Sequence, residues 1–286
     1  MGRKALYKSV NRPVGTVALT FDNLGEAAEL EMEALPADAV LGEHPTATEV
    51  VPALLERLDQ REIAATFFVE GMNAELYPDL LREIDARGHE VAYHAWRHEQ
   101  WDELSVAGQA ENLARGVDAF ARIGVEIAGL RPPGGRLGPG GVGVLREAGL
   151  RYCSPAGAGA GIEDGLALLP FEWRHLDASC VLPALAGARE QMTGSSDPVE
   201  PAAFVASLET EIDRLAAHGG FLAIVLHPFM LDWLGTGNLD ALLDRIAAAR
   251  ERGLRVARCD ETADRVLADP ERFAGATVLD ATSWAS

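Results

Sequence analysis

Short apolar runs alternate along the chain with segments whose apolar side chains recur at helical spacing. Runs rich in Val, Leu, Ile, Phe and Ala predict buried strands at residues 17–21, 64–69, 90–93 and 221–226. Helical spacing predicts helices at residues 50–61, 78–87, 105–123, 201–218 and 238–252. Residues 171–198 have no clear period, and we expect them to be mostly loop.

Strand and helix signals succeed one another without a Pro/Gly-rich linker, which is typical of one α/β domain with a parallel sheet. A count of about seven or eight strand–helix units favours a (β/α) barrel over an open sheet. We expect this domain to span residues 1–268 and a C-terminal tail to follow at residues 269–286.

Composition narrows the classes of partner. The net charge of −19 argues against nucleic acid or an anionic membrane surface as partner. Basic residues near the N-terminus lack a following apolar stretch, so we expect no signal peptide and a cytoplasmic location. Three widely spaced cysteines without a CxxC pair argue against a disulfide framework or a thiolate zinc site. The negative charge fits either an ordinary acidic surface or an enzyme for neutral or cationic small substrates. The sequence leaves self-association of the chain open.

Four polar stretches each follow an apolar run. Asp22 with Asn23 comes first, and the stretch from His94 to His98 comes second. Arg131 followed by two prolines, and His227 followed by one, come third and fourth. Since parallel strands place their carboxyl ends at one end of a barrel, we expect the four stretches to meet there. Taken alone, Asp22 could cap a helix, Arg131 could lie on the surface and His227 in the core.

Together the four stretches supply what a hydrolase needs: a base, metal ligands, an orienting cation and an acid. His94 and His98 are four residues apart, which on a helical turn puts both imidazoles on one face, close enough to share a metal. A guanidinium at Arg131, backed by rigid prolines, can pair bidentately with a carboxylate.

These motifs resemble those of the polysaccharide deacetylase superfamily, the NodB-type carbohydrate esterases, over about residues 17–267. Thr20-Phe21-Asp22-Asn23 is similar to the family's Thr-Phe-Asp-Asp, and the other stretches are similar to its HxxxH, Arg-x-Pro and final His motifs. The resemblance implies a distorted (β/α) barrel of about seven parallel strands. It also implies hydrolysis of a non-peptide C–N bond, namely N-deacetylation of an acetamido sugar, another glycan or a related small-molecule amide.

The resemblance also implies roles for individual residues. Asp22 is then the general base and His227 the general acid, with Arg131 holding Asp22 and Asp177 orienting His227. A zinc ion or another divalent metal would bind His94, His98 and Asn23. The substrate contacts implied or suggested by position are Glu26, Pro133 and Trp173.

Two departures from the family pattern leave alternatives open. Asn23 is neutral where the family has a carboxylate, so it is a weaker metal ligand, and Gly134 replaces the aromatic residue after Arg-x-Pro. Residues 24–26 and 227–229 resemble a cytoplasmic branch that includes metal-independent, allantoinase-like hydrolases. Three hypotheses follow: a metal-assisted deacetylase, a metal-free hydrolase of a cyclic amide, or a non-catalytic protein that binds a ligand.

Overall fold

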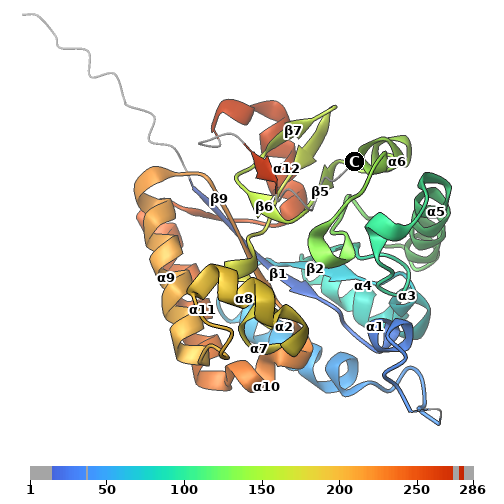
Figure 1. Cartoon of the computed structure of the whole chain (residues 1–286), viewed down its shortest axis with the longest axis horizontal. Helices are drawn as coiled ribbons and strands as arrows, with labels where there is room; N and C mark the ends of the chain where they lie inside the picture. Colours follow the sequence, from blue (N-terminus) through green and yellow to red (C-terminus); the bar gives the residue numbers. More distant parts are fainter. Residues whose placement is uncertain (1–14, 37, 273–276, 280–286) are drawn as a thin grey trace, which may run out of the picture.

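The protein is a curled, mostly parallel sheet surrounded by helices, as the computed structural model shows for residues 15–36, 38–272 and 277–279 (Figure 1). Nine strands form the sheet in the order β10-β1-β2-β3-β4-β5-β8-β7, and β9 pairs with β1. The strands are β1 (Thr16–Asp22), β2 (Thr66–Val69), β3 (Glu90–Tyr93), β4 (Gly129–Leu130), β5 (Tyr152–Cys153), β7 (Gly161–Glu163), β8 (Leu166–Leu168), β9 (Phe221–Leu226) and β10 (Arg255–Val256). A bridge between Leu176 and Val225 links the segment after β8 to β9, so the sheet curls toward closure. The predicted distorted barrel is confirmed.

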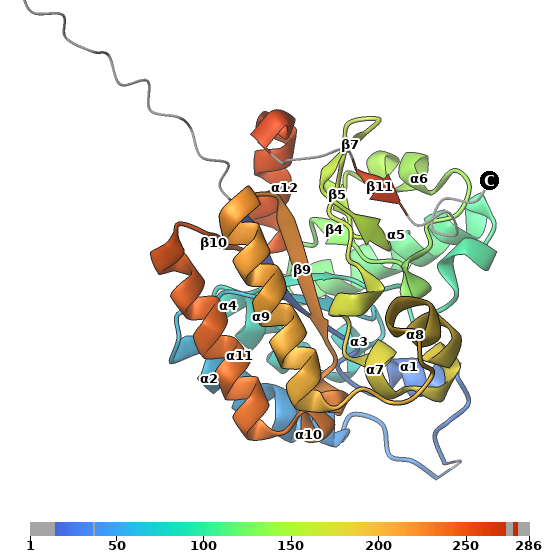
Figure 2. The same ribbon diagram turned by 60° about the vertical axis from the view of Figure 1, so that its left-hand side comes forward.

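Helices cover the outside of this sheet. They are α1 (Ala27–Glu31), α2 (Val51–Asp59), α3 (Asn73–Leu76), α4 (Pro78–Ala86), α5 (Val106–Arg122), α6 (Gly141–Glu147), α7 (Ala178–Val181), α8 (Ala186–Thr193), α9 (Pro201–His218), α10 (Leu231–Leu234), α11 (Thr236–Ala249) and α12 (Cys259–Ala268). Figures 1 and 2 show α9 and α11 side by side, and α9 packs on β9. Ser105 caps α5 as predicted, accepting a hydrogen bond from the Gly108 N–H at 3.1 Å. Within the described ranges, none of the helices is both long and apolar enough to cross a bilayer.

Side chains on β1 alternate between two cores. Val17, Leu19 and Phe21 belong to the large cluster beneath the helices. Ala18 belongs instead to the cluster inside the barrel, where it is joined by Phe68. The inner cluster also takes one alanine from each of β3 and β9, namely Ala92 and Ala223. Because side chains alternate along a strand, this division identifies which residues beyond each strand point inward.

Two regions differ from the sequence prediction. Residues 171–198 were expected to be mostly loop, but they form α7 and α8 as well as short 3-10 turns. Their helical signal is weak because α8 is largely polar and buries only Arg189. In the predicted tail, β11 (Val278–Leu279) pairs with β6 (Gly157–Ala158) in an antiparallel manner. The boundary at residue 268 remains a prediction, and residues 273–276 and 280–286 of the tail lie outside the described ranges.

Candidate active site

Five adjacent strands each carry an inward-pointing polar residue at their carboxyl ends. In spatial order these are His227 after β9, Asp22 at the end of β1, Glu70 after β2, His94 after β3 and Arg131 after β4. All five are buried, with exposed fractions between 0% and 7%. The strand periodicity of two places them on the inner side, in step with Ala18, Phe68, Ala92 and Ala223. The sequence prediction that the polar stretches meet at one end of the barrel is therefore confirmed.

Asp22 and Arg131 form a buried ion pair. Arg131 Nη1 donates to Asp22 Oδ1 at 2.7 Å and to the Thr20 hydroxyl at 2.8 Å. The expected bidentate pairing with the carboxylate does not occur, because Arg131 Nε and Nη2 both donate to the Ser154 hydroxyl. This arrangement leaves Asp22 Oδ2 outside the Arg131 contact. A single charge-assisted bond thus orients the carboxylate and keeps its second oxygen available.

Aromatic rings pack around the Arg131 guanidinium. Its central carbon lies 4.0 Å from the centroid of the Phe68 ring and 5.0 Å from that of Phe171. Ring faces attract a cation, and their bulk excludes water from it. The Asp22–Arg131 pair consequently lies in a region of low dielectric, where its mutual attraction and the cost of losing either partner are both large.

Asp177 holds His227 at two points. Its Oδ1 is 2.6 Å from His227 Nδ1, and its Oδ2 accepts the backbone N–H of His227 at 2.7 Å. The predicted orienting contact is thus present, and the imidazole Nε2 is left for other contacts. Burial lowers the pKa of His227, but the carboxylates of Asp177 and Asp22 outweigh it, so the pKa is raised above its ordinary value. His227 is accordingly more readily protonated than a free histidine side chain.

His94 and His98 meet through a loop, and the predicted helical turn is wrong. Residues 94–100 are irregular, and both Ala95 (φ 64°) and His98 (φ 77°) have left-handed backbone conformations. The two imidazole centroids are nevertheless only 4.9 Å apart. His94 Nδ1 lies 2.7 Å from the Arg131 carbonyl, so it donates there and leaves Nε2 as a free lone-pair donor. Burial lowers the pKa of His94 to about 3, so its imidazole is neutral at neutral pH.

Metal binding by these histidines and Asn23 stays a prediction. Asn23 adopts the left-handed conformation (φ 63°), and its buried Oδ1 has no hydrogen-bond partner among the described residues. In the part of the chain that the structure describes, no three His, Cys, Asp or Glu side chains are grouped to hold a metal. Two neutral imidazoles and an amide oxygen can ligate zinc, but they offer the metal no negative charge.

The three suggested substrate contacts lie in different surroundings and stay predictions. The Glu26 carboxylate is buried and accepts hydrogen bonds from the Gly42 N–H at 2.5 Å and from the Tyr77 hydroxyl. It thereby anchors the loop after α1 to the segment before α4. Pro133 is buried at the start of a short 3-10 turn directly after the Arg131 motif. Trp173 packs on Phe171 at 5.6 Å between ring centroids and lines a cavity of about 260 Å³ on the side of β6 and β11.

Sequence reasoning missed two residues at this end of the barrel. Glu70 is fully buried, and burial chiefly raises its pKa to about 8, with the Asp22 charge adding to the shift. The signal was available, since Glu70 follows the apolar run of β2 just as Asp22 ends that of β1. Phe229 lies 5.1 Å from His227 between ring centroids and is 46% exposed, so it borders the site on the solvent side.

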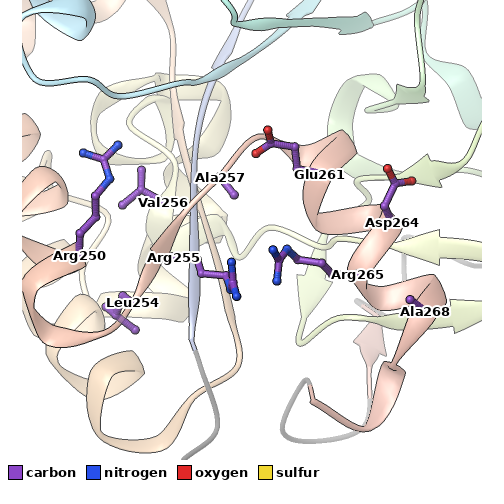
Figure 3. Close-up of a pocket in the computed structure, with 9 residues that line it drawn as sticks. All are labelled: Arg250, Leu254, Arg255, Val256, Ala257, Glu261, Asp264, Arg265 and Ala268. Carbon is purple, nitrogen blue, oxygen red and sulfur yellow. The ribbon is translucent and has the colours of Figure 1, made fainter.

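A larger cavity of about 730 Å³ lies at the opposite end of the barrel (Figure 3). It is bordered by β10, which pairs with the start of β1, and by α12. Figure 3 shows Arg255 and Arg265 directed into the space between these two elements. None of the predicted catalytic residues lines this cavity, so size alone does not identify the active site.

Comparison with known proteins identifies the protein family that the sequence matches. The family model for polysaccharide deacetylase matches residues 9–153, just over half of the chain. A peptidoglycan-N-acetylglucosamine deacetylase from Bacillus cereus is 28% identical over 90 residues, which are 31% of this chain and 33% of that protein. The chain therefore matches about a third of the length of this relative.

Solved structures agree with the fold. A Mycobacterium smegmatis protein assigned to the polysaccharide deacetylases is 26% identical, with a TM-score of 0.74 over 90% of this chain and 91% of that one. The PuuE allantoinase has a TM-score of 0.69 at 17% identity, again over 90% and 91% of the two chains. At that identity, the likeness to the allantoinase concerns the fold alone.

Proposed function

Because the chain belongs to the polysaccharide deacetylase family, we propose that it hydrolyses the C–N bond of an N-acetyl group or related amide, with Asp22 as general base and His227 as general acid. The substrate would be an acetylated glycan or a small-molecule amide. The observation that carries this proposal is the presence, at one end of the barrel, of an oriented carboxylate and an oriented imidazole with a raised pKa. An acid and a base held in separate, buried networks are what amide hydrolysis requires.

In the proposed reaction, Asp22 Oδ2 takes a proton from a water molecule as that water attacks the amide carbonyl carbon. The carbonyl oxygen gains the negative charge, and the Asp22–Arg131 contact keeps the base in place. His227 Nε2 then gives its proton to the amide nitrogen as the C–N bond breaks, yielding an amine and a carboxylic acid. Asp177 stabilises the protonated imidazole before this transfer.

A divalent metal such as zinc would be held by His94 Nε2, the imidazole of His98 and Asn23 Oδ1. When bound there, the metal would polarise the amide carbonyl as a Lewis acid. Support for this role comes from the free Nε2 of His94 and from the buried Asn23 Oδ1, which lacks a partner within the described ranges.

Metal-free hydrolysis of a cyclic amide is the second candidate. It is favoured by the neutral ligand set that Asn23 creates, because such a set binds metal more weakly than one with a carboxylate. Asp22 and His227 would perform the same proton transfers, and the product would be a single ring-opened molecule. A non-catalytic role fits less well, because the contacts that orient both groups are intact.

The test is turnover of two probes by the purified protein, with and without a chelator. We expect acetate release from N-acetylglucosamine tetramer, reduced by the chelator and restored by zinc. Chelator-resistant ring opening of allantoin would favour the second candidate. Absence of product from both probes, even with added zinc, would contradict the proposed function.

A cytoplasmic location and self-association stay predictions.

A further inference from the structure

We propose that the cavity of about 730 Å³ at the amino end of the barrel binds an organic phosphate, whose phosphate oxygens accept hydrogen bonds from Arg255 and Arg265. The cavity borders β10, which pairs with the first residues of β1, whereas Asp22 ends that strand. This binding site is therefore separate from the proposed catalytic residues, and the proposal does not depend on amide hydrolysis.

The two arginines come from different elements that meet at the cavity. Arg255 is on β10 and Arg265 is on α12. Figure 3 shows both guanidiniums reaching toward each other in the space between these elements. Within the described ranges, the Arg265 side chain makes no hydrogen bond or ion pair. Two like charges directed into one open cavity favour an anion bound between them.

The acidic residues of the lining do not pair with Arg265. Asp264 forms its ion pair with Arg151, and Glu261 Oε1 lies 3.9 Å from Arg258 Nη2. In Figure 3, both carboxylates are directed away from the space into which the two guanidiniums reach. The negative charge that would match this guanidinium must therefore come from a bound molecule.

A third arginine adds positive charge at the border of the cavity. Arg250 donates to the Arg61 carbonyl at 3.2 Å and to the Glu62 carbonyl at 2.5 Å. These carbonyls hold the guanidinium in place without neutralising it. Residues 1–14 and 273–276, which precede β1 and follow α12 in the sequence, contain no Asp or Glu. In a chain with a net charge of −19, three arginines on one cavity favour a ligand with several negative charges.

The rest of the lining is apolar. Leu254 and Ala257 are buried, and Val256 lies between them on β10. The cavity volume falls in the range of about 300–1,000 Å³ that is typical of small-molecule sites. Guanidiniums match the geometry of phosphate oxygens, and apolar side chains match the body of an organic molecule. The combination favours an organic phosphate of about the size of a nucleotide over a free phosphate ion.

The test is calorimetric titration of the purified protein with ATP and with pyrophosphate, which lacks the organic body, at the same ionic strength. We expect one ATP per chain and a Kd for ATP about tenfold below that for pyrophosphate. Arg265→Gln should raise the Kd for ATP about tenfold, because a charged hydrogen-bond donor is lost. The double variant Arg255→Gln/Arg265→Gln should bind no measurable ATP. Arg146→Gln, which changes an exposed arginine on α6, is the matched control and should keep the wild-type Kd.

The absence of saturable binding of either probe to the wild type would overturn the inference. Wild-type affinity in Arg265→Gln would do the same, and so would an equal loss in Arg146→Gln, which would indicate general charge attraction. Equal Kd values for ATP and pyrophosphate would contradict contact of the organic body with the apolar lining. Since Arg265 makes no side-chain contact in the described chain, its variant should unfold at the wild-type temperature, which separates lost binding from lost folding.

Discussion

The two ends of the barrel differ in how each pairs a buried glutamate. At the amino end, Glu90 accepts hydrogen bonds from the Thr66 hydroxyl, the Tyr152 hydroxyl and the Asp260 N–H, all at 2.8–3.0 Å. At the carboxyl end, Glu70 accepts from Asn73, and its Oε1 stays unpaired within the described ranges. Burial is the chief cause that raises both pKa values, to about 7 for Glu90 and about 8 for Glu70.

The two glutamates differ in how completely the protein pairs their carboxylate oxygens. Glu90 joins β2, β3, β5 and the start of α12 in a network whose contacts all come from the protein. Near Asp22, by contrast, Asn23 Oδ1 and Glu70 Oε1 are buried without a hydrogen-bond partner among the described residues. Burial and a raised pKa are alike at both ends, and an unpaired buried atom also occurs at His89 Nε2, next to Glu90, so neither feature identifies the site. The convergence of Asp22, Arg131 and His227 at the carboxyl ends of the strands does.

Loss of the Arg131 charge should have the largest effect. Arg131→Met leaves Asp22 as an uncompensated buried charge, and we expect unfolding free energy to fall by about 3–5 kcal/mol in denaturant titration. Arg82→Met, which removes an exposed pair with Asp79, should cost less than about 1 kcal/mol. Equal losses in the two variants would contradict the buried pair as a structural element of the site.

Removal of the Asp177 charge should impair proton donation by His227. Asp177→Asn is expected to lower kcat by roughly 10²-fold or more, because the imidazole loses its orienting partner. Since Asp177 raises the pKa of His227, the alkaline limb of the pH–kcat profile should move to lower pH.

The matched control is Glu172→Gln, which alters a surface pair with Arg174 in the same segment and should keep the wild-type profile. An alkaline limb that stays in place in Asp177→Asn would argue that another group donates the proton.

Glu90 should make stability depend on pH. Its pKa is about 7 in the folded protein against 4.5 for the free side chain, so its contribution is complete below pH 4.5 and is lost as pH rises to about 7. The loss is on the order of 3 kcal/mol at 1.36 kcal/mol per pKa unit.

Glu90→Gln removes this dependence. Between pH 4.5 and 7, the unfolding free energy of the wild type should therefore fall relative to that of the variant. Taking the difference cancels the opposing titration of buried histidines such as His94 and His175, whose pKa values are lowered. A pH-independent difference would contradict the raised pKa of Glu90.

Restoring a carboxylate at Asn23 should have the smallest effect, on metal affinity. Asn23→Asp adds negative charge to the His94–His98 set, and Asp tolerates the left-handed backbone at this position. We expect zinc affinity to increase about tenfold in chelator competition. His94→Ala should abolish the zinc measured by elemental mass spectrometry. An unchanged affinity in Asn23→Asp would show that residue 23 does not ligate the metal.

Hydrophobic periodicity was sufficient to predict most of the fold. The apolar runs at β1, β2, β3 and β9 have two buried faces, so their signal is strong, and α9 begins and ends where its pattern does. The segment containing α8 could not be predicted, because its helix is largely polar and is held by contacts of Arg189 with backbone carbonyls. The antiparallel strand β7 is only three residues long and carries no distinct period.

The sequence predicted the site residues that lie within recognisable motifs. It missed features that depend on the three-dimensional arrangement of the backbone. The His94–His98 pairing depends on left-handed conformations at Ala95 and His98, which residues other than Gly adopt too rarely to be predicted from sequence. Glu26 shares the loop of Asp22, but its orientation toward Tyr77 depends on a contact 51 residues away. Glu70 was missed although it follows the apolar run of β2 as Asp22 ends that of β1, and the strand pairing shows that β1 and β2 are neighbours.

The most direct test of the active end of the barrel compares Asp22→Asn with Glu90→Gln in turnover of the same amide substrate. Asp22→Asn preserves shape but removes the base, so we predict a fall in kcat of about 10³-fold. Glu90→Gln, at the opposite end, should keep kcat within about threefold of wild type. Comparable kcat values for the two variants would contradict the assignment of catalysis to the Asp22 end of the barrel.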